Sequence, residues 1–345
     1  MAEVPNDDVR IFATIPAPAN DGGGYRDQVR RASHLSEAAG FHGALIYSDN
    51  RTVDPWAVAQ ELISATDRLS PLVALQPTYM HPFAVAKKIA SLGLLYGRGV
   101  CLNLVAGGNR GDLAALDDVV EHDARYRRLT EYTRLIEMLL NADHPVTFDG
   151  EHYRVRALTV FPALPRHLRP ELFISGSSVA GRHAGEQLGA VAVRYPEPPG
   201  GDDAGQEPSP HGHGVRLGII ARDCDEQAWA VANERFPASR AGQMRQRMAR
   251  QASDSQWLSR LSAAEEFPGG ADSPYWMGPF RNYASFCPYL VGNREKVAAE
   301  VARYIDAGCR TFIMDTARDE SDYHETRALF ELALSRSVAA REDLH

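Results

Sequence analysis

The chain has 345 residues, of which 44% are hydrophobic and 24% are charged, a composition typical of a globular protein. Its 37 Lys and Arg residues against 45 Asp and Glu residues give a formal net charge of −8, which argues against broad binding to nucleic acid or to an acidic membrane surface. No stretch approaches roughly 18 uninterrupted apolar residues, and the first residues lack the pattern of a secretory signal, so we expect no membrane span. The four cysteines are far apart in the sequence, which is typical of free thiols in a reducing compartment, and we expect a cytoplasmic protein.

Short apolar segments alternate with helical patterns along most of the chain, which predicts βα units around a parallel sheet. Strands in this rhythm indicate an α/β fold of the closed (β/α)8 type, a TIM barrel, formed as one domain by residues 1–345. The predicted strands cover residues 9–15, 43–48, 71–77, 99–105, 171–177, 190–195, 215–222 and 310–315. The predicted helices cover residues 25–39, 54–66, 82–96, 122–141, 178–188, 225–236, 293–307 and 320–338.

Three segments interrupt the barrel pattern. Residues 146–165 predict a hairpin insertion that turns at Asp149-Gly150. Residues 197–214 contain too much Pro and Gly for a helix, so we expect a flexible loop there and one degenerate barrel helix. Residues 237–292 form a long insertion before the last helix, and its mixture of Gly, Pro and aromatic residues is typical of an active-site lid.

Polar residues follow several predicted strands at their carboxyl ends, where barrels of this type have their active sites. Asn103 lies inside the apolar run 100–105, and burying its amide without a partner costs about 1–3 kcal/mol. We therefore expect a specific hydrogen-bond partner for Asn103. The other polar residues near strand ends are Ser48, Asn50, Gln76, Thr78, Ser175, Ser177, Ser178, Arg194, Tyr195, Asp315 and Thr316, with Arg216 near the start of its strand.

The segment "FISGSSVAG" runs from an apolar strand through Gly176, Ser177 and Ser178 directly into a helix. Backbone N–H groups, two hydroxyls and the positive end of a helix dipole would converge there, as in sites that bind phosphate. The alternative is a turn in which Ser178 is simply the N-cap of the helix. Phosphate sites in barrels favour such late strand-to-helix turns, which favours the first interpretation.

Other chemistries lack their sequence patterns. The twelve histidines form no HExxH motif and no cluster with cysteines, so we expect no metal. A GxSxG motif and a GxGxxG motif are both missing from the sequence, which argues against a serine hydrolase and against a Rossmann dinucleotide site.

Several segments together resemble the bacterial luciferase-like flavin monooxygenases, within them the alkanesulfonate monooxygenase branch. The resemblance covers most of residues 10–236 and then residues 289–315. The segments that carry it include "GRGVCLNLVAGGNRGDL", "HDARYRRLTEY", "VTFDGEHYRVRALTVFPAL", "LFISGSSVAGRHAGEQLGAVAVRYPEPP", "VRLGIIARDCDEQAW" and "YLVGNREKVAAEVARYIDAGCRTFIMD".

The resemblance implies a (β/α)8 barrel that uses reduced FMN (FMNH2) from a separate NAD(P)H-dependent flavin reductase. The cofactor reacts with O2 to give a flavin peroxide, which oxygenates a small substrate. A homodimer or homotetramer is also implied. Ser177 and Ser178 would hold the FMN phosphate, and Gly176 would bind the cofactor in the same turn. Tyr126 would contact the cofactor, and Ala74 and Asn103 would lie beside the isoalloxazine ring. Arg216, helped by Arg281 of the lid, would hold a negatively charged group of the substrate.

Departures from the alkanesulfonate pattern concern the substrate pocket. A Cys of that branch is Val53 here, and a His two residues after Arg216 is Gly218. We therefore expect poor turnover of short alkanesulfonates and a pocket widened at Gly218 for a bulkier anionic organosulfur or heteroatom substrate. Two alternatives are a deazaflavin (F420)-dependent hydride-transfer enzyme on the same barrel and a flavin-binding protein without catalytic activity.

Overall fold

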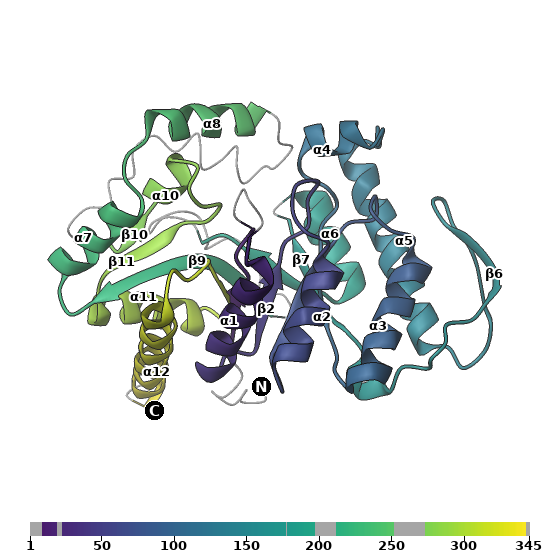
Figure 1. Ribbon diagram of the computed structural model, residues 1–345, viewed down its shortest axis with the longest axis horizontal. Coiled ribbons are helices and arrows are strands. Elements are labelled where there is room, and N and C mark those ends of the chain that lie inside the picture. Colours follow the sequence, from purple (N-terminus) through teal and green to yellow (C-terminus); the bar gives the residue numbers. More distant parts are fainter. Residues whose placement is uncertain (1–8, 19–22, 177, 197–211, 252–272, 343–345) are drawn as a thin grey trace.

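Eight parallel strands close into a barrel in the computed structural model, which describes residues 9–18, 23–176, 178–196, 212–251 and 273–342 (Figure 1). Each strand pairs with two neighbours in the order β12-β1-β2-β3-β4-β7-β8, and β9 closes the barrel between β8 and β12. This confirms the predicted (β/α)8 fold. The barrel strands are β1 Arg10–Thr14, β2 Gly43–Ile46, β3 Ser70–Leu75, β4 Cys101–Leu104, β7 Glu171–Ser175, β8 Val191–Arg194, β9 His213–Arg222 and β12 Cys309–Met314.

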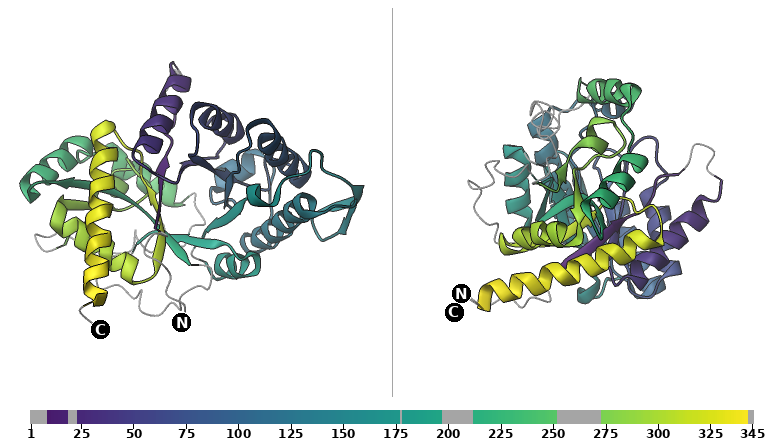
Figure 2. Two further views of the ribbon diagram at one scale, coloured as in Figure 1. Left: turned by 90° about the horizontal axis from the view of Figure 1, so that it is seen from below. Right: turned by 90° about the vertical axis from the view of Figure 1, so that its left-hand side faces the viewer.

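Helices surround the strands, as the two views in Figure 2 show. They bury their apolar faces against the outward side chains of the barrel; Leu217 of β9 and Val301 of α11, for example, belong to one fully buried cluster. The predicted helices are all present. They are α1 Tyr25–Ala38, α2 Pro55–Ala65, α3 Pro82–Tyr96, α5 His122–Asn141, α6 Val179–Leu188, α7 Asp225–Arg235, α11 Arg294–Asp306 and α12 Glu320–Glu342.

The inside of the barrel is packed with side chains that alternate with the outward ones. Phe12, Leu72, Phe173 and Ile313 form one buried cluster within it. Parallel pairing in register places Arg216 opposite Ile313, so its side chain also lies on the inner face, because neighbours in register point to the same side of a sheet.

The chain adds two strands that the sequence pattern did not predict. β9 continues past the barrel, and its second half pairs in parallel with β11 Tyr289–Asn293. β10 Tyr275–Trp276 then pairs antiparallel with β11. The remaining additions are the short helices α4 Arg110–Ala115, η2 Arg166–Leu168, α8 Arg240–Gln251 and α10 Gly278–Arg281.

The predicted hairpin insertion is present as β5 Val146–Asp149 and β6 Arg154–Leu158. Asp149 pairs with Arg154, so the turn spans four residues instead of centring on Asp149-Gly150. The cause is Glu131 of α5, whose carboxylate accepts hydrogen bonds from the backbone N–H groups of residues 151, 152 and 153 at 2.6–2.9 Å. The turn is therefore fixed to the helix beneath it.

Two predicted features fall largely outside the described residues. The degenerate helix and flexible loop at 197–214 lie there except for the last three residues, of which His213 and Gly214 belong to β9. Much of the predicted lid, residues 252–272, also lies there. Within the described ranges, no helix has the length and apolarity that crossing a bilayer requires, and no group of His, Cys, Asp and Glu is arranged to bind a metal ion.

Candidate active site

The carboxyl ends of β3, β4 and β7 place three small inward-facing residues side by side. Ala74 and Asn103 are paired in register across β3 and β4, and the Ser175 hydroxyl donates to Asn103 Oδ1 at 2.9 Å. This hydrogen bond gives the buried Asn103 carbonyl oxygen the partner that the sequence required. Its side-chain N–H groups have no acceptor among the described residues, so this amide still has donor capacity toward the barrel mouth.

The turn after β7 leads directly into α6, as predicted. Ser178 is the N-cap, and its buried Oγ accepts from the backbone N–H of Gly181 at 3.1 Å. The phenol of Tyr126, on α5, hydrogen-bonds to Ser178, and burial raises the tyrosine pKa despite that contact. Gly176 is glycine for a steric reason, because a Cβ there would lie 2.6 Å from the Tyr126 hydroxyl.

The start of α6 has the features of both interpretations of the GSS motif, the helix cap and the phosphate site. Capping uses the N–H of Gly181, whereas the N–H groups of Val179 and Ala180 at the start of the helix remain to meet an anion. Ser177 lies outside the described residues. The structure thus brings together Gly176, Ser178 and Tyr126, three of the residues predicted to bind FMN, of which Ser178 was predicted to hold its phosphate.

Arg216 lies on the inner face of the barrel on β9, which is separated from β7 by β8, and is only 7% exposed. Its guanidinium stacks 4.8 Å from the ring centre of Tyr47, which follows β2. The nearest carboxylate is Asp315 after β12, with Nη2 3.7 Å from Oδ1, too far for a hydrogen bond. Nε and Nη2 are buried and have no hydrogen-bond partner among the described residues. A buried cation with unused donors is typical of a site for an anionic ligand.

Residues of the insertion hold Asp315 in place. The hydroxyls of Ser285 and Tyr289 donate to its Oδ2 at 2.6 and 2.8 Å. Burial and the nearby Asp315 carboxylate raise the pKa of Tyr289 well above its usual value, so the phenol remains a neutral donor. Sequence analysis missed Tyr47, Ser285 and Tyr289, since nothing local in the sequence places β11 beside β9.

The structure shows that the predicted widening at Gly218 is wrong. Gly218 is paired in register with Tyr289 across β9 and β11, and a Cβ at Gly218 would lie 2.2 Å from the tyrosine ring. The space left by the missing side chain is therefore filled by Tyr289. The glycine is needed for the close approach of this ring.

Replacing Gly218 with alanine should destabilise the protein by about 1–3 kcal/mol, because the added methyl overlaps a buried ring. Urea unfolding would measure this loss. Tyr289→Ala should reduce the cost of Gly218→Ala in a double-mutant cycle. Gly108→Ala is a matched control, since a Cβ there meets nothing within 4 Å. Equal stability of the two alanine variants would contradict the steric explanation.

Arg281 and Val53, which the sequence analysis discussed for the substrate site, lie apart from Arg216 and Asp315. Arg281 ends the short helix α10 with an exposed side chain, and among the described residues it contacts neither Arg216 nor Asp315. Val53 is 40% exposed and lines a cavity of about 290 Å³ at the ends of β2 and β3, together with Ser48, Ala74 and Gln76. This cavity adjoins Ala74, where the flavin ring was predicted.

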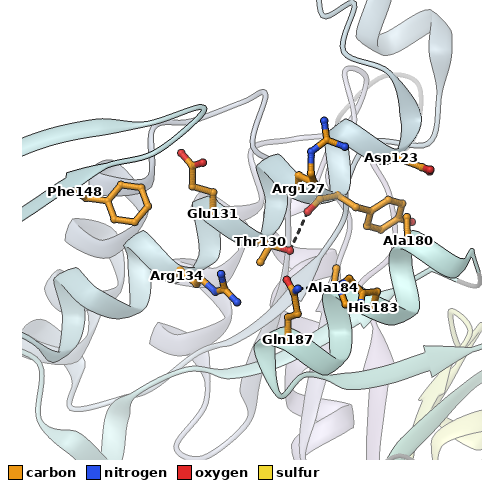
Figure 3. Close-up of a pocket in the computed structure, with 11 residues that line it drawn as sticks. Asp123, Arg127, Thr130, Glu131, Arg134, Phe148, Ala180, His183, Ala184 and Gln187 are labelled. Atoms are coloured by element: carbon orange, nitrogen blue, oxygen red, sulfur yellow. Dashed lines mark hydrogen bonds between the residues drawn. The ribbon is translucent and has the colours of Figure 1, made fainter.

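A larger groove of about 480 Å³ lies outside the barrel, between α5 and α6 (Figure 3). Its lining includes Thr130, which donates to the Tyr126 carbonyl at 3.0 Å, and Gln187, which hydrogen-bonds His183 at 2.8 Å. Tyr126 and Ala180, which lies in the first turn of α6, link this groove to the start of that helix. We place the active site at the strand ends, because the groove is lined by helices and by the hairpin and none of the barrel's inward side chains reach it.

Comparison with known proteins identifies the family of this chain. A model of the luciferase-like monooxygenase family matches residues 9–311. The 4-(gamma-L-glutamylamino)butanoyl-(BtrI acyl-carrier protein) monooxygenase of Niallia circulans is 33% identical over 327 residues, which are 92% of this chain and 95% of that protein.

Solved structures share the same fold. EDTA monooxygenase from Chelativorans sp. BNC1 superposes with a TM-score of 0.70 at 14% identity, covering 96% of this chain and 94% of that one. Riboflavin lyase, solved with modified FMN and riboflavin, gives a TM-score of 0.75 at 15% identity, covering 95% and 91%. The chain belongs to the luciferase-like monooxygenase family.

Proposed function

We propose that this protein is the oxygenating component of a two-component monooxygenase that uses reduced FMN, O2 and a separate NAD(P)H-dependent flavin reductase. Ser178, Tyr126 and the first turn of α6 would hold the FMN phosphate, and Ala74 and Asn103 would face the ring. Reduced FMN and O2 supply the oxygenating chemistry. The protein contributes binding, orientation and exclusion of water.

The observation that supports an anionic substrate is the buried guanidinium of Arg216 with unused donors. Tyr47 covers one face of the guanidinium, and Asp315 stands beyond hydrogen-bond distance, so neither satisfies the N–H groups. A carboxylate or sulfonate could accept two of these N–H groups at once. Arg216 would thus fix the distance between the anionic end of a substrate and its oxidised atom.

The relative from Niallia circulans is named for an acyl group carried on an acyl-carrier protein. We extend this to the present chain and propose a carrier-tethered acyl substrate that ends in an anionic group. A small organosulfur anion, the sequence-based alternative, would contact the same arginine. The tethered acyl group is favoured because the 33% identity extends over nearly the full length of both proteins.

A reconstituted reaction tests this function. The protein is mixed with FMN, a flavin reductase, NADPH and the 4-(gamma-L-glutamylamino)butanoyl thioester of pantetheine under isotopically labelled O2. We expect O2 uptake and a product that contains one labelled oxygen atom. Turnover with reduced F420 but not with FMNH2 would indicate the deazaflavin alternative, and FMN binding without any product would indicate a flavin-binding protein.

The resemblance to the family is also the basis for a proposal about the oligomeric state. We expect a homodimer or homotetramer, which light scattering of the purified protein would show.

A further inference from the structure

Helix α8, Arg240–Gln251, is strongly basic in this acidic chain because its sequence RAGQMRQRMARQ contains four arginines and no acidic residue. Met244 and Met248 are 65% and 64% exposed and lie one turn apart. The buried side of the helix consists of Gly242 and Gln246. Its solvent-facing arginines are Arg240, Arg245, Arg247 and Arg250.

These arginines have no carboxylate partner within the described part of the chain. Elsewhere on the surface, exposed arginines commonly pair with a neighbouring acid, as Arg327 does with Glu331 and Arg303 with Glu300. A surface of four guanidinium groups without a carboxylate partner among the described residues stands out against the net charge of −8. Such a patch attracts an acidic partner and steers its approach.

Helix α8 lies at the mouth of the barrel. It lies over α10 at the same end of the molecule as α4, which follows β4 (Figure 1). The Asn282 side-chain oxygen accepts from the backbone N–H of Ser239, just before α8, at 3.2 Å and from Gln243 at 3.5 Å. Gly242 packs closely against Asn282, because a Cβ at position 242 would lie 2.0 Å from the Asn282 carbonyl oxygen. This contact leaves no room for a side chain at position 242.

The segment that holds α8 also reaches the candidate active site. Three residues after Asn282, Ser285 donates to Asp315, which stands beside Arg216. On either side of Ser285 in the sequence, Tyr283 and Phe286 form an exposed aromatic pair with ring centres 5.8 Å apart. A partner bound to α8 would therefore sit at the barrel mouth, beside the segment that reaches Asp315 and Arg216.

From these observations we infer that α8 is the docking surface for an acidic carrier protein that delivers the substrate, an inference that rests on the function proposed above. The arginines would pair with carboxylates on the carrier, and the two methionines would pack against its apolar residues, since their flexible side chains adapt to a partner. An anionic membrane is the competing occupant. It is disfavoured because α8 has no Trp, Phe or Leu to enter the lipid boundary.

A direct binding measurement tests the docking surface. Fluorescently labelled holo BtrI acyl-carrier protein is titrated with the full-length enzyme, and anisotropy is followed at low and high salt. We expect saturable binding that weakens with salt. Arg245→Glu combined with Arg247→Glu should raise the dissociation constant by at least about tenfold.

The matched control is Arg166→Glu combined with Arg169→Glu. These exposed arginines precede β7 at the opposite end of the barrel, and the charge change is identical. Carrier binding that is equal in both double variants, or no binding of the carrier by the wild type, would overturn the inference. So would co-sedimentation with phosphatidylserine vesicles that depends on Arg245 and Arg247 without any carrier binding.

Two further measurements separate this inference from the proposed function. FMN binding and turnover of the pantetheine thioester should be unchanged in the α8 double variant, because α8 contacts neither Ser178 nor Arg216. Carrier binding with the expected variant pattern but without turnover of the thioester would reject the proposed reaction and leave the docking surface standing.

Discussion

Arg216→Ala should lower kcat/KM for the anionic substrate by an amount equivalent to about 2–5 kcal/mol, the usual cost of removing one partner of a buried charge pair. The substrate anion would lose two donors, and the substrate would no longer be oriented relative to the flavin. The loss should appear mainly in substrate recognition, while FMN binding stays unchanged because Ser178 and Tyr126 are untouched. Steady-state kinetics with the thioester, beside a titration with FMN, would measure both.

Two variants sharpen this test. Arg216→Lys keeps the charge but loses the fork of N–H groups, so it should recover only part of the activity. Arg222→Ala, on the same strand, removes a guanidinium that lies 3.9 Å from Asp322 instead, and it should leave substrate recognition near that of the wild type. An unchanged kcat/KM for Arg216→Ala would exclude Arg216 as the anion site.

Ser178→Asp should abolish FMN binding while keeping α6 stable. Aspartate caps a helix as well as serine does, but its carboxylate would repel the phosphate. Ser178→Ala should instead cost about 1 kcal/mol of stability through the lost cap and weaken FMN binding by the loss of one hydrogen bond, about 1.5–3 kcal/mol when an ion is involved. Fluorescence titration with FMN and urea unfolding would separate the two effects.

The outcome decides between the two roles of the GSS motif. If Ser178→Asp binds FMN like the wild type, the serine serves only as a helix cap. Combining Ser178→Ala with Ser177→Ala should weaken FMN binding further, as the sequence-based phosphate site requires. Tyr126→Phe offers a milder change, since it removes only the hydroxyl that hydrogen-bonds to Ser178.

The sequence was sufficient to predict the barrel because its information is local. An apolar run such as that of β4, followed by a Gly-rich turn, marks a buried strand whatever lies beside it. The N-cap at Ser178 is local in the same sense, since its hydrogen bond spans three residues. Asn103 was predictable as a polar group that needs a partner, but Ser175 lies 72 residues away, and only the pairing of β4 with β7 brings the two together.

The surroundings of Arg216 could not be predicted for the same reason. Tyr47 and Asp315 follow separate strands, and Tyr289 reaches Gly218 because β11 pairs with the second half of β9. The apolar run of β11 stands in an insertion rich in Gly and Pro, without the preceding helix that marks a barrel strand. The glycine at position 218 therefore suggested an empty space, but the ring of Tyr289 fills that space in the folded protein.

The pairing of β9 with β11 bears on how substrates enter. Five consecutive residue pairs, from Tyr289 opposite Gly218 to Asn293 opposite Arg222, join this part of the insertion to a barrel strand. Moving it aside would break a ladder of backbone hydrogen bonds and expose buried residues such as Tyr289 and Val291. This part of the insertion is accordingly a fixed wall, and its amide protons should exchange with solvent as slowly as those of the barrel itself.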